Sequence, residues 1–305
     1  MAWMMDKRGR DQFLIQHQRE FTVCWNDAKK RCAEPFFNRS FWSDGPMSWS
    51  PLGTYATTLH AQGVALWVSK ADGSFERVSR FACPGVQKVD FSAQEELLTC
   101  YSVQQQKNSP PDVLMTVFDA RSGRKLRTLQ ESLPKLLVGR MEVNRHRIAE
   151  PFLSWSTTTP PLAAKLAVDA VQVYDGADMT MLDKKSIVLQ GVQDACWSPA
   201  ANILAVYQTE HGNLPARVSL LSLPDKSELR QKNLFAVASA TLSWHPQGSY
   251  LAVHVRLPHR SSAAHACLVI SGAARDHFSR GSAGGEVHQV EEVHVCHHRA
   301  LHSQE

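Results

Sequence analysis

The C-terminal end of the chain gathers side-chain types that transition metals prefer as ligands. Four of them lie close together in the sequence: His294, Cys296, His297 and His298. Imidazole and thiolate groups at this spacing could hold a metal ion. The surrounding residues, 271–305, are rich in Gly, Ala, Ser and His and show no hydrophobic alternation, which is typical of a poorly structured segment. We therefore predict a His-rich tail with no metal site, and no bound cofactor.

No catalytic motif occurs elsewhere in the sequence. The motifs G-x-S-x-G and H-E-x-x-H, the Walker A loop and the dinucleotide motif G-x-G-x-x-G are all absent. A Ser/His/Asp triad could be assembled from distant residues of any chain with 14 histidines, so that possibility carries no weight. The sequence predicts a protein that is not an enzyme and has no small-molecule substrate.

Basic side chains are the remaining candidates for a chemical role, because Lys and Arg neutralise nucleic-acid phosphates. They form three clusters: Lys29, Lys30 and Arg31; Arg121, Arg124, Lys125 and Arg127; and Arg140, Arg145 and Arg147. These loops either contact RNA phosphates or are ordinary solvated turns. No aromatic residues alternate with them in the sequence, so base-specific recognition of RNA is not expected.

The composition restricts such contacts to local surfaces. The chain has 33 Lys and Arg against 29 Asp and Glu, and a net charge of +4 on 305 residues cannot steer the whole molecule to a polyanion. No stretch is apolar and long enough to cross a membrane, and the N-terminus lacks the apolar region of a secretory signal. The seven cysteines contain no C-x-x-C pair and fit reduced thiols. We expect a cytoplasmic protein with no membrane contact.

The elements that would position these residues come from an internal repeat. An aromatic residue, a polar residue, Pro and then an apolar run recur along the chain, with degenerate copies between the clear ones. The aromatic anchors are Trp49, Phe91, Trp155, Trp197 and Trp244. Their spacings of 42, 64, 42 and 47 residues match the roughly 40–50 residues of a four-stranded propeller blade. We predict that the anchors pack between blades.

Local patterns within each period indicate strands. Ser, Pro and Gly after the anchor favour a type I turn. Short runs rich in Val, Leu and aromatic residues follow, at 63–67, 113–119, 170–174 and 216–222. Helical periodicity is not sustained over a dozen residues anywhere. The fold class is therefore predicted to be all-β, a WD-repeat-like β-propeller, because a β-sandwich would not repeat with a 42-residue period.

Three regions depart from the repeat. Residues 104–111 form a polar loop with two prolines, and the basic insertion at 130–151 accounts for the long interval. We predict a partial propeller over 1–270 and a tail over 271–305, whose abrupt change of composition suggests a frameshifted or mis-predicted coding end. Sequencing the transcript across codons 260–280 tests this, and an uninterrupted frame confirmed in the protein would contradict it.

The order of the segments between the anchors resembles the B-subunit family of eukaryotic translation initiation factor 3 over roughly residues 10–270. The segments are WNDA (25–28), WSPLGTY (49–55), GVALW (63–67), GVQKVDFS (85–92), LDKKS (182–186), PARVSL (215–220) and RQKNLF (230–235). The resemblance implies a non-catalytic scaffold whose partners are the other subunits of the factor and the small ribosomal subunit, including rRNA phosphates.

The resemblance also implies a propeller of about nine blades between an RNA-recognition-type domain and a C-terminal helical segment, whereas this chain supplies about five or six blades and neither flank. Whether the blades close into a ring stays open. The alternative functions are a WD-repeat adaptor of another complex, and a propeller enzyme or the accessory propeller of a peptidase.

Overall fold

The computed structural model describes residues 10–70, 74–105, 107, 109–132, 152–256 and 265–271. The chain divides into two compact units. The first is built mainly from residues 10–132, together with the short segment Ala177–Met179, and the second mainly from residues 152–176, 180–256 and 265–271. The prediction of an all-β fold is confirmed: the described elements are antiparallel strands, apart from one short 3₁₀ turn, η2 (Leu182–Lys184).

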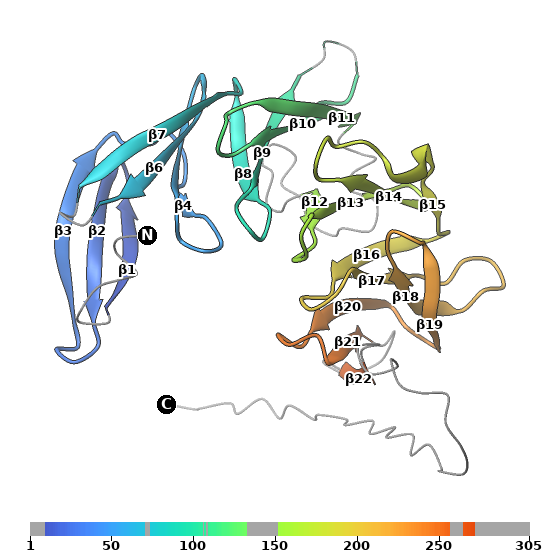
Figure 1. Ribbon diagram of the computed structural model, residues 1–305. Helices are drawn as coiled ribbons and strands as arrows, with labels where there is room; N and C mark the ends of the chain where they lie inside the picture. The colour runs from blue at the N-terminus through green and yellow to red at the C-terminus, as the bar shows by residue number, and fades with distance from the viewer. Residues whose placement is uncertain are drawn as a thin grey trace. The chain divides into compact units, whose positions relative to one another are not determined.

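The first unit holds three sheets in which each strand pairs with the next along the chain (Figure 1). The first sheet consists of β1 (Asp11–His17), β2 (Glu20–Asp27) and β3 (Cys32–Ser40). The second sheet consists of β4 (Ser48–Trp49), β5 (Ala56–His60), β6 (Gly63–Ser69) and β7 (Phe75–Ala82). The third sheet consists of β8 (Val86–Phe91), β9 (Leu97–Gln104), β10 (Asp112–Asp119) and β11 (Lys125–Ser132).

The second unit repeats this organisation. The fourth sheet consists of β12 (Leu153–Trp155), β13 (Leu162–Ala167), β14 (Ala170–Asp175) and β15 (Ile187–Val188). The fifth consists of β16 (Val192–Trp197), β17 (Ile203–Gln208), β18 (Ala216–Ser222) and β19 (Ser227–Leu234). The sixth consists of β20 (Ser239–Trp244), β21 (Tyr250–Arg256) and β22 (His265–Ser271). Four of these six sheets of described residues have the four strands predicted for each period, and the number of blades stays a prediction.

The middle sheet of each unit buries both faces, because successive side chains of a strand point to opposite sides. In β17, Leu204 and Val206 pack with Val173 of the fourth sheet. Tyr207 packs instead with Val253 of the sixth sheet. A sheet covered on both sides needs near-continuous apolar strands, which is why the central strands are Val- and Leu-rich and do not alternate with polar residues.

The second sheet has the same two-sided burial in the first unit. Leu66 of β6 joins a cluster with Leu98 of the third sheet. Its neighbour Trp67 joins a cluster with Phe21 of the first sheet. Each such side chain removed from water contributes about 1.5–3 kcal/mol. The stacking of sheet on sheet is therefore the main source of stability in each unit.

The turn predicted after each aromatic anchor is present. The anchor is the last residue of the first strand of its sheet. The N–H groups of Ser50, Ser92 and Ser156 each donate to a carbonyl at the start of the next strand or one residue before it, at 2.8–3.0 Å. The hydroxyl of each serine also accepts the backbone N–H of that same residue. Gly53 donates to the Ser50 carbonyl at 2.8 Å and has φ of 73°. The Gly of the motif is therefore placed where the backbone must be left-handed.

A second backbone link ties this turn to the turn before the last strand of the same sheet. Ala120 N–H donates to the Glu96 carbonyl in the third sheet, and Leu223 N–H donates to the Asn202 carbonyl in the fifth, both at 2.9 Å. The two turns lie at one edge because first and third strands run in the same direction in an antiparallel meander. The β10–β11 turn, which carries one of the basic clusters, is thus part of a hydrogen-bonded framework.

The structure places the five aromatic anchors at different depths. Phe91, Trp155 and Trp197 are buried, whereas Trp49 and Trp244 are half-buried. Within the second unit two of the indoles donate to the preceding sheet: Trp197 Nε1 to the Ser154 carbonyl at 3.0 Å and Trp244 Nε1 to the Cys196 carbonyl at 3.2 Å. These two hydrogen bonds link neighbouring sheets, so mutation of the indoles can test the packing role predicted for the anchors.

Candidate functional site

The first basic cluster lies in the turn between β2 and β3. Asp27, the last residue of β2, accepts the backbone N–H groups of Lys29 and Lys30 on Oδ1, both at 3.1 Å. These hydrogen bonds, with Lys30 first among the causes, lower the pKa of the Asp27 carboxyl. Arg31 completes the turn with φ of 51°. The Asp27 carboxylate thus binds the backbone of the turn and not its basic side chains. Lys29, Lys30 and Arg31 are all exposed.

One carboxylate neutralises part of this cluster. Glu34 of β3 pairs with Lys30 Nζ at 2.5 Å through one oxygen and with Arg10 Nη1 at 3.0 Å through the other. The hydrogen bond from Lys30 is the largest cause of the lowered pKa of Glu34. A shared carboxylate leaves this turn with an excess of positive charge, carried mainly by Lys29 and Arg31.

The second basic cluster lies in the turn between β10 and β11. Asp119 Oδ1 accepts from the backbone N–H of Arg121 at 3.1 Å and of Ser122 at 2.7 Å, and from the Ser122 hydroxyl at 2.8 Å. These bonds, with the Ser122 N–H first, lower the pKa of Asp119. Gly123 follows with φ of 73° and open space around it. An aspartate thus pins this turn as Asp27 pins the first.

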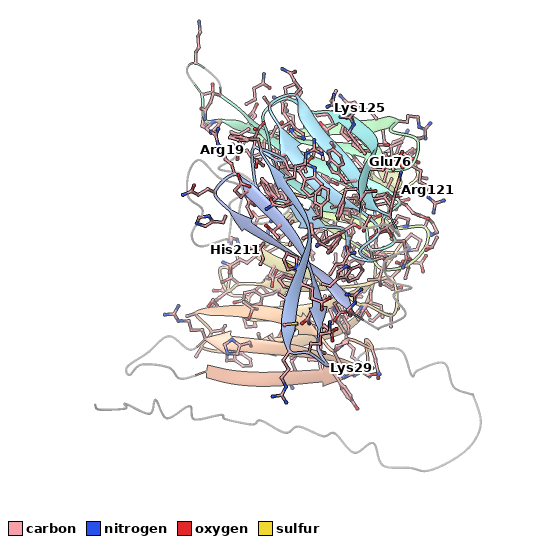
Figure 2. All side chains as sticks on the ribbon, turned by 90° about the vertical axis from the view of Figure 1, so that its left-hand side faces the viewer. Arg19, Lys29, Glu76, Arg121, Lys125 and His211 are labelled. Atoms are coloured by element: carbon pink, nitrogen blue, oxygen red, sulfur yellow. The ribbon has the colours of Figure 1, made fainter. Side chains whose placement is uncertain are left out.

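The four basic residues predicted here are exposed but not equivalent. Arg121, Arg124 and Lys125 flank the turn, and Figure 2 shows Arg121 and Lys125 at the surface of the first unit. Arg127 lies within β11, and its Nη1 donates to the carbonyl of Met179 at 2.8 Å. Arg127 therefore has a structural bond that a phosphate would have to compete with, and the other three are the better candidates.

The remaining predicted residues lie outside the described part of the chain. Arg140, Arg145 and Arg147 belong to the insertion at 130–151, of which the structure describes only residues 130–132, and the cluster at 294–298 belongs to the tail. Among the residues that the structure does describe, no group of three or more His, Cys, Asp or Glu side chains could hold a metal ion. In the same described residues no helix is long and apolar enough to span a membrane.

Two neighbouring thiols of the first unit influence each other's pKa. Cys83 and Cys100 share an apolar cluster between the second and third sheets, and both are buried. The hydrogen bond from Cys100, followed by one from Ser102, lowers the pKa of Cys83 to about 7, and the pKa of Cys100 is raised well above its ordinary value. Since both residues are buried, neither sulfur is open to a substrate at the surface.

Sequence reasoning missed one gathering of basic residues. Arg39, Arg77 and Arg80 are scattered in the sequence, but the fold brings all three close to His60 and two of them over Trp67. Only the pairing of strands brings them together, so no local run of basic residues could have revealed them.

Comparison with known proteins shows that the chain is similar to one subunit of a translation initiation factor. No protein-family model matches it. It is 39% identical over 257 residues to the B subunit of eukaryotic translation initiation factor 3 of Nicotiana tabacum, and the match covers 83% of this chain and 35% of the relative. The corresponding protein of Xenopus laevis is 32% identical over 256 residues, covering 83% of this chain and 34% of the relative. The chain thus spans about a third of the length of these relatives.

A solved structure supports the same assignment at the level of the fold. A chain described as the crystal structure of the eukaryotic initiation factor superposes with a TM-score of 0.63 at 18% identity, covering 86% of this chain and 61% of that one. This likeness, with the repeated meander sheets, confirms the predicted propeller type of fold. The resemblance found in the sequence is confirmed as well: the chain is homologous to part of the B subunit of eukaryotic translation initiation factor 3 of plants, animals and fungi.

Proposed function

We propose that the chain is a non-catalytic, cytoplasmic scaffold of translation initiation factor 3 that supports docking of the factor on the small ribosomal subunit. The observation that carries this proposal is the homology to the B subunit over 83% of the chain. Its partners are the other subunits of the factor and the small ribosomal subunit, with no small-molecule substrate and no membrane contact. Its chemistry is binding alone.

The pinned turns support this proposal. Because Asp27 and Asp119 each hold a turn through backbone N–H groups, the basic side chains of both turns stand on an ordered backbone. Phosphate contacts made from such turns have little backbone entropy to lose and are sensitive to salt but not to sequence. That is the behaviour expected of a scaffold that docks on folded rRNA.

Sedimentation of a cell extract through a sucrose gradient tests the proposal. The tagged chain should migrate with the small ribosomal subunit and with other subunits of the factor. The triple variant Arg121→Glu, Arg124→Glu, Lys125→Glu should shift toward the top of the gradient, because three phosphate contacts become repulsive, and its difference from the wild type should be largest at low salt, where the repulsion is least screened. Arg127 is left intact because of its bond to Met179.

The control variant carries the same change of charge at exposed positions of the second unit: Lys184→Glu, Lys185→Glu and Arg230→Glu. It should sediment as the wild-type chain does. Equal migration of both variants with the small ribosomal subunit would remove the β10–β11 turn from the interface. Migration of the wild-type chain with an unrelated set of proteins would favour a WD-repeat adaptor of another complex and contradict the proposal.

A further inference from the structure

Three arginines converge where the first and second sheets face each other. The guanidinium carbon of Arg39, from β3, lies 5.0 Å from the centre of the Trp67 ring. The guanidinium carbon of Arg77, from β7, lies 6.0 Å from the same ring. Arg39 also lies 5.8 Å from the Trp42 ring, and Trp42 meets Trp67 edge to face at 5.3 Å. The two arginines thus cover a pair of packed indoles.

A β-bulge brings the third arginine to the same side. In β7, Arg77 lies opposite Trp67 and Arg80 opposite Ala65, and the register shifts between these two pairs. Without that shift, residues three apart in a strand would point to opposite faces. Trp67 and Ala65 both face the first sheet. Arg77 and Arg80 therefore share this face, although the sequence places them out of phase.

The strand register of the first sheet places Arg39 on the side that faces the second sheet. Arg39 is the register partner of Phe21, and Phe21 is fully buried in the cluster that joins the two sheets. Partners in an antiparallel pair point to the same side. Arg39 therefore extends toward the second sheet, while its own side chain stays exposed.

A polar chain supports the indole beneath the arginines. Trp67 Nε1 donates to the Thr58 hydroxyl at 2.8 Å, and that hydroxyl lies 2.8 Å from His60 Nε2. Burial is the first cause of the lowered pKa of His60, and Asp44 opposes this shift while Arg80, Arg39 and Arg77 add to it. All three arginines are thus close enough to act on one imidazole.

The positive charge of the three arginines is not offset by paired carboxylates. Among the described residues, neither Arg39, Arg77 nor Arg80 forms an ion pair, and Glu76 is engaged with Lys70 at 2.8 Å. A guanidinium that lies over a ring uses its face, so the N–H groups on its edges remain available as donors. Planar donors of this kind match the oxygens of a phosphate.

An exposed aromatic ring follows Arg39 closely in the chain. Phe41 has φ of 55° and 69% of its surface is exposed. The guanidinium carbon of Arg19 lies 5.3 Å from its ring. Figure 2 shows Arg19 at the end of the first sheet opposite to Lys29. An exposed ring that contacts one guanidinium group and follows another by two residues in the chain is a combination suited to single-stranded nucleic acid, since a base can stack while phosphates are neutralised.

We propose that Arg39, Arg77 and Arg80 form a phosphate-binding patch for single-stranded RNA, with Phe41 as a stacking surface for a base. The patch is distinct from the β2–β3 turn, since Arg39 and Arg31 are eight residues apart along an extended strand, about 26 Å. The proposal deepens the proposed function and takes from it the choice of RNA over other polyanions.

Equilibrium binding of the purified full chain to a fluorescein-labelled, 20-nucleotide RNA of mixed sequence tests the patch. The variant Arg39→Gln, Arg77→Gln, Arg80→Gln should bind at least about tenfold more weakly at low salt. The slope of log affinity against log salt should fall by about 2, since each phosphate contact on a single strand contributes about 0.7. Phe41→Ala should weaken binding about fivefold or more with the slope unchanged.

The control variant Lys184→Gln, Lys185→Gln, Arg230→Gln removes the same charge elsewhere and should bind as the wild type does. The variant Arg39→Lys, Arg77→Lys, Arg80→Lys should keep most of the salt slope but lose affinity, because an ammonium group cannot bind bidentately. Equal binding by the triple Gln variant and its control, both folded by circular dichroism, would overturn the proposal. A poly-glutamate peptide that binds the patch as tightly as the RNA would overturn the assignment to RNA.

The two proposals fail separately. Loss of RNA binding in the triple Gln variant without any change in the sucrose gradient would keep the patch and exclude it from ribosome docking. Loss of ribosome docking in the turn variant with normal RNA binding would keep the β10–β11 turn as a docking surface and leave RNA binding to the patch.

Discussion

Replacement of Trp197 by Ala measures how strongly the aromatic anchors hold neighbouring sheets together. Trp197 is only 8% exposed and packs in the cluster between the fourth and fifth sheets, with Leu204 and Val173 among its neighbours. Its indole N–H donates to the Ser154 carbonyl at 3.0 Å. Truncation therefore removes a large buried ring and also leaves a carbonyl without its donor.

The expected cost follows from these two losses. Large aromatic residues in a packed core lose about 3–5 kcal/mol when changed to Ala. Trp197→Phe keeps most of the ring and loses mainly the hydrogen bond, so it should cost about 1–2 kcal/mol. The two variants together separate the packing contribution from the hydrogen bond to Ser154.

Urea unfolding followed by far-UV circular dichroism is the suitable assay, with the midpoint compared at constant slope. Phe235→Ala is the matched control, because Phe235 is 76% exposed and should change stability by no more than about 0.5 kcal/mol. If Trp197→Ala unfolds at the wild-type midpoint, Trp197 does not join the sheets, and the interpretation of all five anchors as packing residues is refuted.

Two further changes test local features of the first unit. Burial raises the pKa of Asp90 to about 6, so the folded chain holds this proton more tightly than the unfolded chain, and stability falls as pH rises from about 4 to about 6. Asp90→Asn should therefore increase the free energy of unfolding at pH 7.5 by about 2 kcal/mol and raise the melting temperature. Between about pH 4 and 6 the melting temperature of the variant should depend less on pH than that of the wild type. A lower melting temperature at about pH 7.5 would contradict the burial argument. Gly63→Ala should unfold or severely destabilise the chain, because φ of 146° and a carbonyl oxygen of β7 leave no room for a methyl group. Gly123→Ala, at φ of 73° in open space, should cost only about 1 kcal/mol in the same melting experiment, and equal losses for the two glycines would show that steric overlap is not the cause.

Much of the fold could be predicted because its determinants are local. An aromatic residue followed by Ser specifies the end of a strand and a turn, and in the clear copies Pro comes next. The serine hydroxyl accepts a backbone N–H, as Ser50 and Ser92 do. The spacing of these local units along the chain matched that of propeller blades and so predicted sheets that stack on one another. The two described basic turns were found for the same reason, since Lys29–Arg31 and Arg121–Lys125 are each contiguous or nearly so in the chain.

The patch around Trp67 could not be predicted because its determinants are not local. Arg77 and Arg80 share a face only through the bulge in β7, and nothing in the sequence around Val78 marks that bulge. Arg39 arrives from another sheet. Positions that depend on register and on the facing sheet are invisible to a search for runs of basic residues.

The difference between the turns and the patch has a functional consequence. At the turns, Asp27 and Asp119 fix the backbone but leave long basic side chains in water, so each phosphate contact must offset the entropy of ordering a side chain. At the patch, the rings of Trp67 and Trp42 already hold the guanidinium groups of Arg39 and Arg77. Pre-ordered groups lose less on binding. For an equal number of phosphate contacts, the patch should therefore bind RNA more tightly than either turn, and the triple Gln variant should lose more affinity than a variant with Gln at positions 29, 30 and 31.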